Sequence, residues 1–213
     1  MLPALLAELD RHGLAVFDGG HAYNLNIVGI RSDNRDQTDD AFDDWMTCTY
    51  RTEPGGSWIT KWWPCTTDPG KQALLHPEMY NSQGTLIMAP GQYRSAYVLG
   101  LHANRYEALV QRGPNPINIY RDNNLDAVLD TDPDTFVSGF FGANIHKAGT
   151  DSERISGINS SGRKWTWSAG CQVFKREQDF NELMDLCHLQ IEHHPNWAKT
   201  FTYTLIEEKD LWT

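Results

Sequence analysis

The segment "WMTCTYRTEPGGSWITKWWPCT" (residues 45–66) decides the fold class of this chain. Residues 45–52 and 57–66 are rich in aromatic and β-branched side chains, which fit the pleated surface of a strand. The four residues between them, "EPGG", are typical of a turn. The segment therefore predicts a β-hairpin.

Similar segments occur on both sides of this hairpin and indicate a β-rich protein. We expect strands within residues 23–32, 84–102, 107–113, 117–124, 139–149, 162–174 and 200–208. Two amphipathic helices are predicted, one near the N-terminus and one over residues 176–194. We predict a single domain over residues 1–213, with residues 1–22 as an N-terminal helical extension.

Composition and charge exclude several classes of function. The net charge is −10 and there is no lysine- or arginine-rich run, which disfavours nucleic-acid binding. No apolar stretch reaches the ~18 residues needed to cross a bilayer, so we expect no membrane insertion. The first residues lack a basic leader and contain Glu8 and Asp10, so no signal peptide is expected.

The cysteines and histidines give no strong metal signal. The four cysteines are scattered, with no CxxC pair; Cys48 and Cys65 lie in neighbouring strand segments, and the sequence leaves open whether they form a disulfide. In "HLQIEHH" (188–194), His188 and Glu192 share a helical face, but no third ligand is evident. We expect no metal and no nucleotide cofactor.

A histidine and a cysteine each lie at the end of a predicted strand, beside glycine. His146 is in "NIHKAG" (144–149) and Cys171 in "WTWSAGCQVF" (165–174). A cysteine nucleophile needs an imidazole close in space, and a turn before the cysteine can aim backbone N–H groups beside the sulfur. The alternative is that Cys171 is a small buried apolar residue and His146 a core histidine.

The pattern I-H-x-x-G followed by S-x-G-C resembles the signature of the L,D-transpeptidase catalytic domain (YkuD-like). The resemblance covers residues 139–174, and more loosely 57–174. It implies an L,D-transpeptidase-like mixed sheet or sandwich, with His146 as the base and Cys171 as the nucleophile. Ala169 replaces the histidine that this family has between serine and glycine.

The resemblance also implies roles for the neighbouring residues. The N–H groups of Ala169, Gly170 and Cys171 would stabilise the oxyanion. The supporting residues would be Ser168, which completes the cysteine motif, together with Asn144, Lys147 and Gly149. Asn144 should point to the same face of its strand as His146 and could orient the imidazole or the substrate, or could make a structural hydrogen bond. Arg163 and Lys164 are candidates to meet a substrate carboxylate, or lie in a solvated loop.

The implied function is a cysteine-dependent enzyme that cleaves or transfers peptidoglycan stem peptides through an acyl-enzyme. A wall substrate without an export signal fits a phage lysin or a virion-associated protein that acts on the cell wall. The alternatives are a non-catalytic wall-binding or structural virion module, and a cysteine peptidase that acts on ordinary proteins. Whether the acceptor is water or an amine, and the oligomeric state, stay open.

Overall fold

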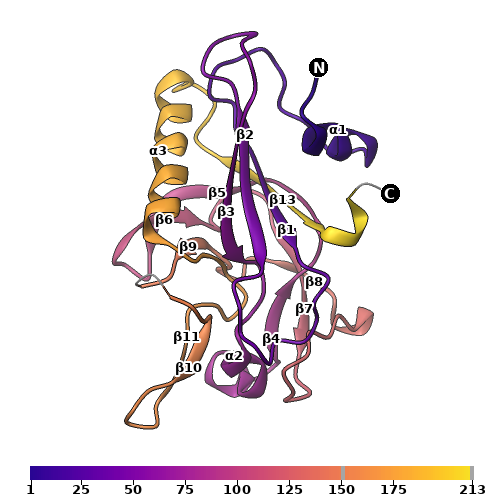
Figure 1. Ribbon diagram of the computed structural model, residues 1–213, viewed down its shortest axis with the longest axis vertical. Helices are drawn as coiled ribbons and strands as arrows, with labels where there is room; N and C mark the ends of the chain where they lie inside the picture. Colours follow the sequence, from indigo (N-terminus) through magenta and orange to yellow (C-terminus); the bar gives the residue numbers. More distant parts are fainter. Residues whose placement is uncertain (150–151, 212–213) are drawn as a thin grey trace.

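The computed structural model describes residues 1–149 and 152–211, and within them eight strands close into a barrel (Figure 1). In order around the barrel the strands are β1 (Asn26–Arg31), β13 (Phe201–Glu207), β5 (Gly91–His102), β6 (Tyr106–Val110), β9 (Ile145–Lys147), β12 (Gln172–Phe174), β3 (Ile59–Thr66) and β2 (Asp44–Tyr50). Closure gives every one of these strands two hydrogen-bonded neighbours.

The predicted hairpin at residues 45–66 is confirmed as β2 and β3. Tyr50 pairs with Ile59 next to the turn, and Asp44 pairs with Cys65 at the far end. Side chains alternate between the two faces of a strand. Trp63 is therefore buried in the core, whereas Trp62 is exposed and contacts the exposed Trp45 edge-on. Cys48 and Cys65 are both free thiols.

Two pairs of barrel strands are parallel, and both join segments that are distant in sequence. β1 pairs with β13, and β9 pairs with β12. The second pair sets Val173 opposite His146 and Gln172 opposite Ile145. Because Cys171 immediately precedes β12, this register brings the cysteine beside the strand that carries the histidine.

Helices lie near both ends of the described chain. α1 (Ala4–Arg11) buries Leu5, Leu6 and Leu9 against β1, and α3 (Glu177–His193) lies along one side of the barrel (Figure 1). α3 buries most of its predicted apolar face, including Phe180, which contacts Phe174 of β12. A third helix, α2 (Lys71–Leu75), was not predicted, because five residues are too few for a helical period to show.

Two small sheets flank the end of the barrel that carries Cys171. One consists of β4 (Thr85–Met88), β7 (Ile117–Asp122) and β8 (Val137–Gly139), and the other of β10 (Ser156–Ile158) and β11 (Lys164–Thr166). The remaining elements are short 3-10 turns, η1 (Pro77–Met79), η2 (Pro133–Thr135) and η3 (Glu208–Asp210). β4 and β7 form one wall of the cavity described below.

The β-rich class with an N-terminal and a C-terminal helix is confirmed. The sheet is mixed, as expected, but it closes into a barrel and does not form a sandwich. Closure depends on the parallel pairing of β1 with β13, in which Ile27 lies opposite Tyr203, and no local sequence pattern indicates a pairing between segments so far apart. In the described residues no helix is long and apolar enough to cross a membrane.

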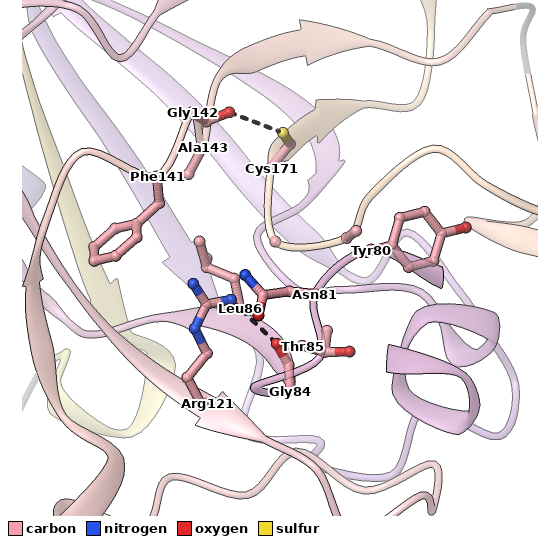
Figure 2. Close-up of a pocket in the computed structure, with 12 residues that line it drawn as sticks. Tyr80, Asn81, Gly84, Thr85, Leu86, Arg121, Phe141, Gly142, Ala143 and Cys171 are labelled. Carbon is pink, nitrogen blue, oxygen red and sulfur yellow. Dashed lines mark hydrogen bonds between the residues drawn. The ribbon is translucent and has the colours of Figure 1, made fainter. Parts of the chain in front are cut away.

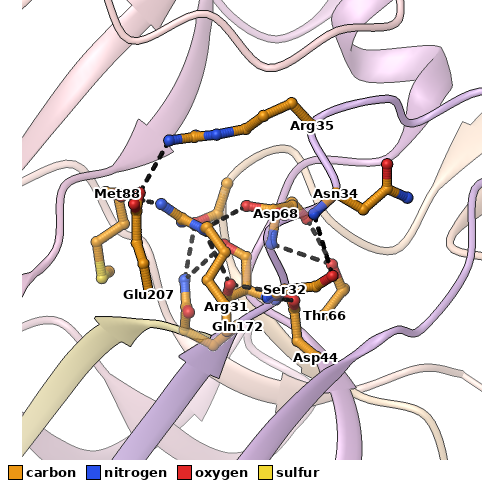
Figure 3. A network of polar contacts seen from close by, with 12 residues as sticks. Arg31, Ser32, Asn34, Arg35, Asp44, Thr66, Asp68, Met88, Gln172 and Glu207 are labelled. Atoms are coloured by element: carbon orange, nitrogen blue, oxygen red, sulfur yellow. Dashed lines mark hydrogen bonds and ion pairs between the residues drawn. The ribbon is translucent and has the colours of Figure 1, made fainter. Parts of the chain in front are cut away.

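A buried polar network lies inside this end of the barrel (Figure 3). Arg31 is fully buried and forms an ion pair with Asp68, with 2.7 Å between Nε and Oδ1. Its Nη atoms donate hydrogen bonds to the carbonyl oxygens of Met88 and Thr67, at 2.9 and 3.0 Å. Gln172, the residue after Cys171, donates to the same Thr67 carbonyl and to Gly170 O. The network therefore connects the buried arginine to the cysteine turn.

Candidate active site

A cavity of about 220 Å³ opens beside Cys171 at the junction of the barrel and the β4–β7–β8 sheet (Figure 2). It is smaller than the ~300–1,000 Å³ of pockets that enclose drug-sized ligands, so it suits the end of a chain molecule. The lining residues are Tyr80, Asn81, Gly84, Thr85, Leu86, Arg121, Phe141, Gly142, Ala143, Ala169, Gly170 and Cys171. Cys171 contributes the thiol to this lining, and Tyr80 and Thr85 contribute hydroxyl groups.

The turn that presents Cys171 is held by Ser168, whose side chain is fully buried. The Ser168 hydroxyl donates to the carbonyl of Cys171 (2.8 Å) and accepts a hydrogen bond from the N–H of Gly170 (3.1 Å). The Gly170 N–H is therefore occupied within the turn. In the described residues the N–H groups of Ala169 and Cys171 have no such partner, so these two are the candidate oxyanion donors of the turn.

Gly170 is required by both its backbone conformation and its surroundings. Its φ is +117°, and a Cβ at this position would lie 2.6 Å from the carbonyl oxygen of Leu86. Gly162 also has a positive φ, +79°, but has open space around its Cα. A side chain at position 162 would therefore meet backbone strain alone, whereas one at position 170 would meet a less accessible φ together with a clash.

We expect Gly170→Ala to destabilise the protein more than Gly162→Ala does. Backbone strain costs about 1–3 kcal/mol at either position, and the clash with Leu86 adds roughly 1–3 kcal/mol at position 170 alone. Urea unfolding of the two variants measures the difference. Equal losses would show that the turn relaxes away from Leu86.

His146 is buried and its ring is fixed by the adjacent main chain. Its Nδ1 lies 2.8 Å from the carbonyl oxygen of Lys147 and 3.3 Å from the hydroxyl of Tyr106, which itself donates to the Lys147 carbonyl. A carbonyl can only accept, so Nδ1 carries the proton and Nε2 is the basic nitrogen. This tautomer is the one a general base needs.

The ring of His102 stacks on that of His146, with the ring centres 4.0 Å apart. His102 ends β5 and pairs with Tyr106 at the start of β6, so one hairpin supplies both neighbours of the imidazole. The hydrogen bonds of the Asn144 side chain within the described residues go to other groups than His146: its Nδ2 lies 3.1 Å from His102 Nδ1, and its Oδ1 accepts from Gln111 N–H. Asn144 is therefore linked to His146 only indirectly, through the stacked ring of His102.

The other two predicted supporting residues have structural contacts. Lys147 forms an ion pair with Glu177 of α3, and its ammonium group lies 5.1 Å from the centre of the Tyr106 ring. A Cβ added at Gly149 would clash with the ring of Trp167, so this glycine permits close packing. Neither residue lines the Cys171 cavity.

The thiol and the imidazole are both neutral in the resting protein. Burial and, secondarily, the charge of His102 lower the pKa of His146 to about 3. Burial raises the pKa of Cys171 to about 11, although the backbone N–H of Asn144 acts in the opposite direction. The Cys171 thiol donates to the carbonyl of Gly142 (3.8 Å), and in the described residues no hydrogen bond joins its sulfur to His146. His146 in β9 and Cys171 just before β12 are therefore neighbours that form no ion pair within the described residues.

These pKa values predict how Cys171 reacts with iodoacetamide. The thiolate is the reactive form, so the alkylation rate should rise about tenfold per pH unit between pH 7 and pH 10. Mass spectrometry of the intact protein measures the rate. Cys171→Ala should take up no label, because Cys48, Cys65 and Cys187 are fully buried. A rate that is already at its maximum near pH 7 would contradict the raised pKa.

Other sequence candidates lie away from this cavity. His188 pairs with Glu107 of β6, at 2.7 Å between Nε2 and Oε2. In the described part of the chain no cluster of His, Cys, Asp and Glu side chains could hold a metal ion. Trp165 contacts Trp167, and with Arg163 and Lys164 it lines a separate hollow at the β10–β11 hairpin.

The sequence did not single out His102, Tyr106 or Arg121 as site residues. His102 and Tyr106 flank a turn, "HANRY" (102–106), that resembles any other hairpin connection. Arg121 lies in a strand next to another polar residue, Asp122. The chain matches no model of a known protein family, no curated protein and no solved structure.

Proposed function

We propose that this protein is a cysteine-dependent enzyme that cleaves or transfers peptidoglycan stem peptides, in the manner of an L,D-transpeptidase. The observation that carries the catalytic part is the parallel pairing of β9 with β12. It sets Cys171, at the mouth of a cavity, beside the strand that holds His146 in the tautomer of a general base. The peptidoglycan substrate rests on the resemblance of the His146 and Cys171 motifs to those of the L,D-transpeptidase family.

The chemistry follows from the neutral state of both groups. His146 Nε2 would accept the thiol proton as the sulfur attacks the peptide carbonyl, because no resting thiolate is available. The carbonyl oxygen would be stabilised by the Ala169 and Cys171 N–H groups. The C–N bond then breaks, the released amine takes the proton from His146, and a thioester remains on Cys171. Water or a second amine would release the acyl group.

The test is to incubate the protein with purified stem tetrapeptides and with isolated cell walls, and to analyse the products by mass spectrometry. We expect loss of the terminal residue or formation of a new cross-link, and a transient mass increase on Cys171. Protein that has been alkylated on Cys171 beforehand is the control. Identical product profiles from the active and the alkylated protein would refute the proposal.

One observation favours a second candidate, a non-catalytic wall-binding module. The pKa values of Cys171 and His146 are shifted away from those of an activated pair, and the sulfur has no hydrogen bond to the imidazole among the described residues. A module of this kind would bind cell walls equally well with or without alkylation of Cys171. Sedimentation with cell walls therefore separates the two candidates in the same experiment.

A further inference from the structure

Arg121 places a positive charge in the same cavity as Cys171. Arg121 belongs to β7, and its side chain points into the cavity (Figure 2). The turn that carries Cys171 forms the opposite wall of this cavity. One Nη atom donates to the carbonyl of Gly84 at 3.1 Å, and the guanidinium group lies 5.5 Å from the centre of the Phe141 ring. These two contacts hold the arginine in place without neutralising it.

The Arg121 charge has no counterion among the described residues. In residues 1–149 and 152–211, no Asp or Glu side chain lies within ion-pair distance of the Arg121 guanidinium. Every other part of this cavity is lined by neutral groups. A half-buried arginine stays charged at neutral pH. Its remaining N–H groups are thus available to a ligand, and the planar fork of an arginine matches a carboxylate.

We propose that Arg121 is a specificity-determining residue that binds a substrate carboxylate close to the bond attacked by Cys171. This inference rests on the proposed function and specifies that the cavity recognises a carboxylate of the substrate. In a stem peptide the carboxylate has two sources, the free C-terminus of the leaving residue and the side chain of a diamino acid with an extra carboxyl group. If Arg121 binds the free C-terminus of the leaving residue, Cys171 would act on terminal peptide bonds and not on internal ones.

The kinetic test compares the wild type with Arg121→Gln and Arg121→Lys on matched stem peptides. The peptides differ in one group at a time: a C-terminal acid or amide, and a diamino acid with or without its side-chain carboxylate. Loss of a charge-assisted contact should raise KM for the recognised acid roughly 10- to 100-fold in Arg121→Gln, with little change for the matched peptide that lacks that carboxylate. Arg121→Lys should recover part of the loss. The peptide whose discrimination disappears identifies the source of the carboxylate.

Arg112→Gln is the matched control, because Arg112 is an exposed arginine outside the cavity. Turnover that is equally fast in the wild type and in Arg121→Gln would overturn the inference while leaving the proposed function intact. The same is true of an equal loss on all four peptides. Thermal melting of each variant verifies that it is folded. If Arg121→Gln is unfolded, the comparison of the wild type with Arg121→Lys on the same four peptides replaces it.

A second readout does not depend on turnover. Iodoacetate carries a carboxylate and iodoacetamide does not, and both alkylate Cys171. In Arg121→Gln the rate with iodoacetate should fall several-fold, while the rate with iodoacetamide is unchanged. If no stem peptide is turned over but this selectivity depends on Arg121, the carboxylate site stands and the proposed function fails. If the ratio of the two rates is the same in both proteins, Arg121 does not bind carboxylates in this cavity.

Discussion

Alanine at position 171 is expected to abolish turnover of a stem peptide, and alanine at position 146 to reduce it by roughly 10²- to 10⁴-fold. Without Cys171 no thioester can form, so the loss should be at least about 10⁴-fold. Without His146 the thiol must lose its proton to water, and its pKa of about 11 makes this unfavourable near neutral pH. Rates of product formation, measured by chromatography of the peptides, give both numbers.

The control for His146→Ala is His188→Ala, which removes an exposed histidine on α3 that pairs with Glu107. This variant should keep the wild-type rate. Because deprotonation of Cys171 no longer depends on an imidazole, the residual rate of His146→Ala should rise with pH up to about 11. A His146→Ala variant that retains more than a tenth of the activity would rule out this histidine as the general base.

The largest effect on stability is expected for Arg31→Met, with a loss of about 3–5 kcal/mol in the free energy of unfolding. The variant keeps the bulk of the side chain but leaves Asp68 buried without its cation. It also removes the hydrogen bonds that Arg31 donates to the carbonyl oxygens of Met88 and Thr67, and the Thr67 carbonyl then keeps only the longer hydrogen bond from Gln172. Urea unfolding followed by tryptophan fluorescence measures the loss. A decrease below about 1 kcal/mol would show that water enters the network and replaces the arginine.

The stability lost in Arg31→Met should depend on pH, and the ionisation of Asp68 determines the direction of this dependence. Burial raises the pKa of this carboxyl above that of an unfolded aspartate even with Arg31 present, and removing the cation raises it further. A raised pKa in the folded state costs stability as pH increases above the unfolded value of ~3.9. The difference between the wild type and Arg31→Met should therefore be smaller at pH 4 than at pH 7. Adding Asp68→Asn should recover part of the stability at pH 7.

The sequence predicted the β-rich class and the two long helices because both depend on local periodicity. The alternation of Trp62 and Trp63 across β3, and the spacing of Phe180 and Leu183 in α3, are visible over a few residues. Barrel closure depends on pairing between distant segments, which no local pattern encodes. Arg31 was also missed, because one charged residue at the end of a strand gives no indication that its partners are buried with it.

The candidate site was predicted in part. The motifs indicated His146 and Cys171, and the structure places His146 in β9 and Cys171 immediately before the parallel neighbour strand β12. Their surroundings could not be predicted, because His102, Tyr106 and Arg121 come from β5, β6 and β7 and meet the motif only through tertiary packing. The raised pKa of Cys171 has the same origin, since it reflects burial by the folded chain.

Because β13 lies between β1 and β5, the barrel can close only after the last strand of the chain has been synthesised. On the ribosome, β1 and β5 emerge early but lack the strand that joins them until β13 has been synthesised. Until then the barrel is an open sheet, and its two edge strands expose unpaired backbone N–H and C=O groups. Pairings between segments so distant in sequence also form slowly. Tyr203 of β13 also donates a hydrogen bond to Gln172, the neighbour of Cys171. The nascent chain therefore carries its cysteine for some time without a finished cavity around it.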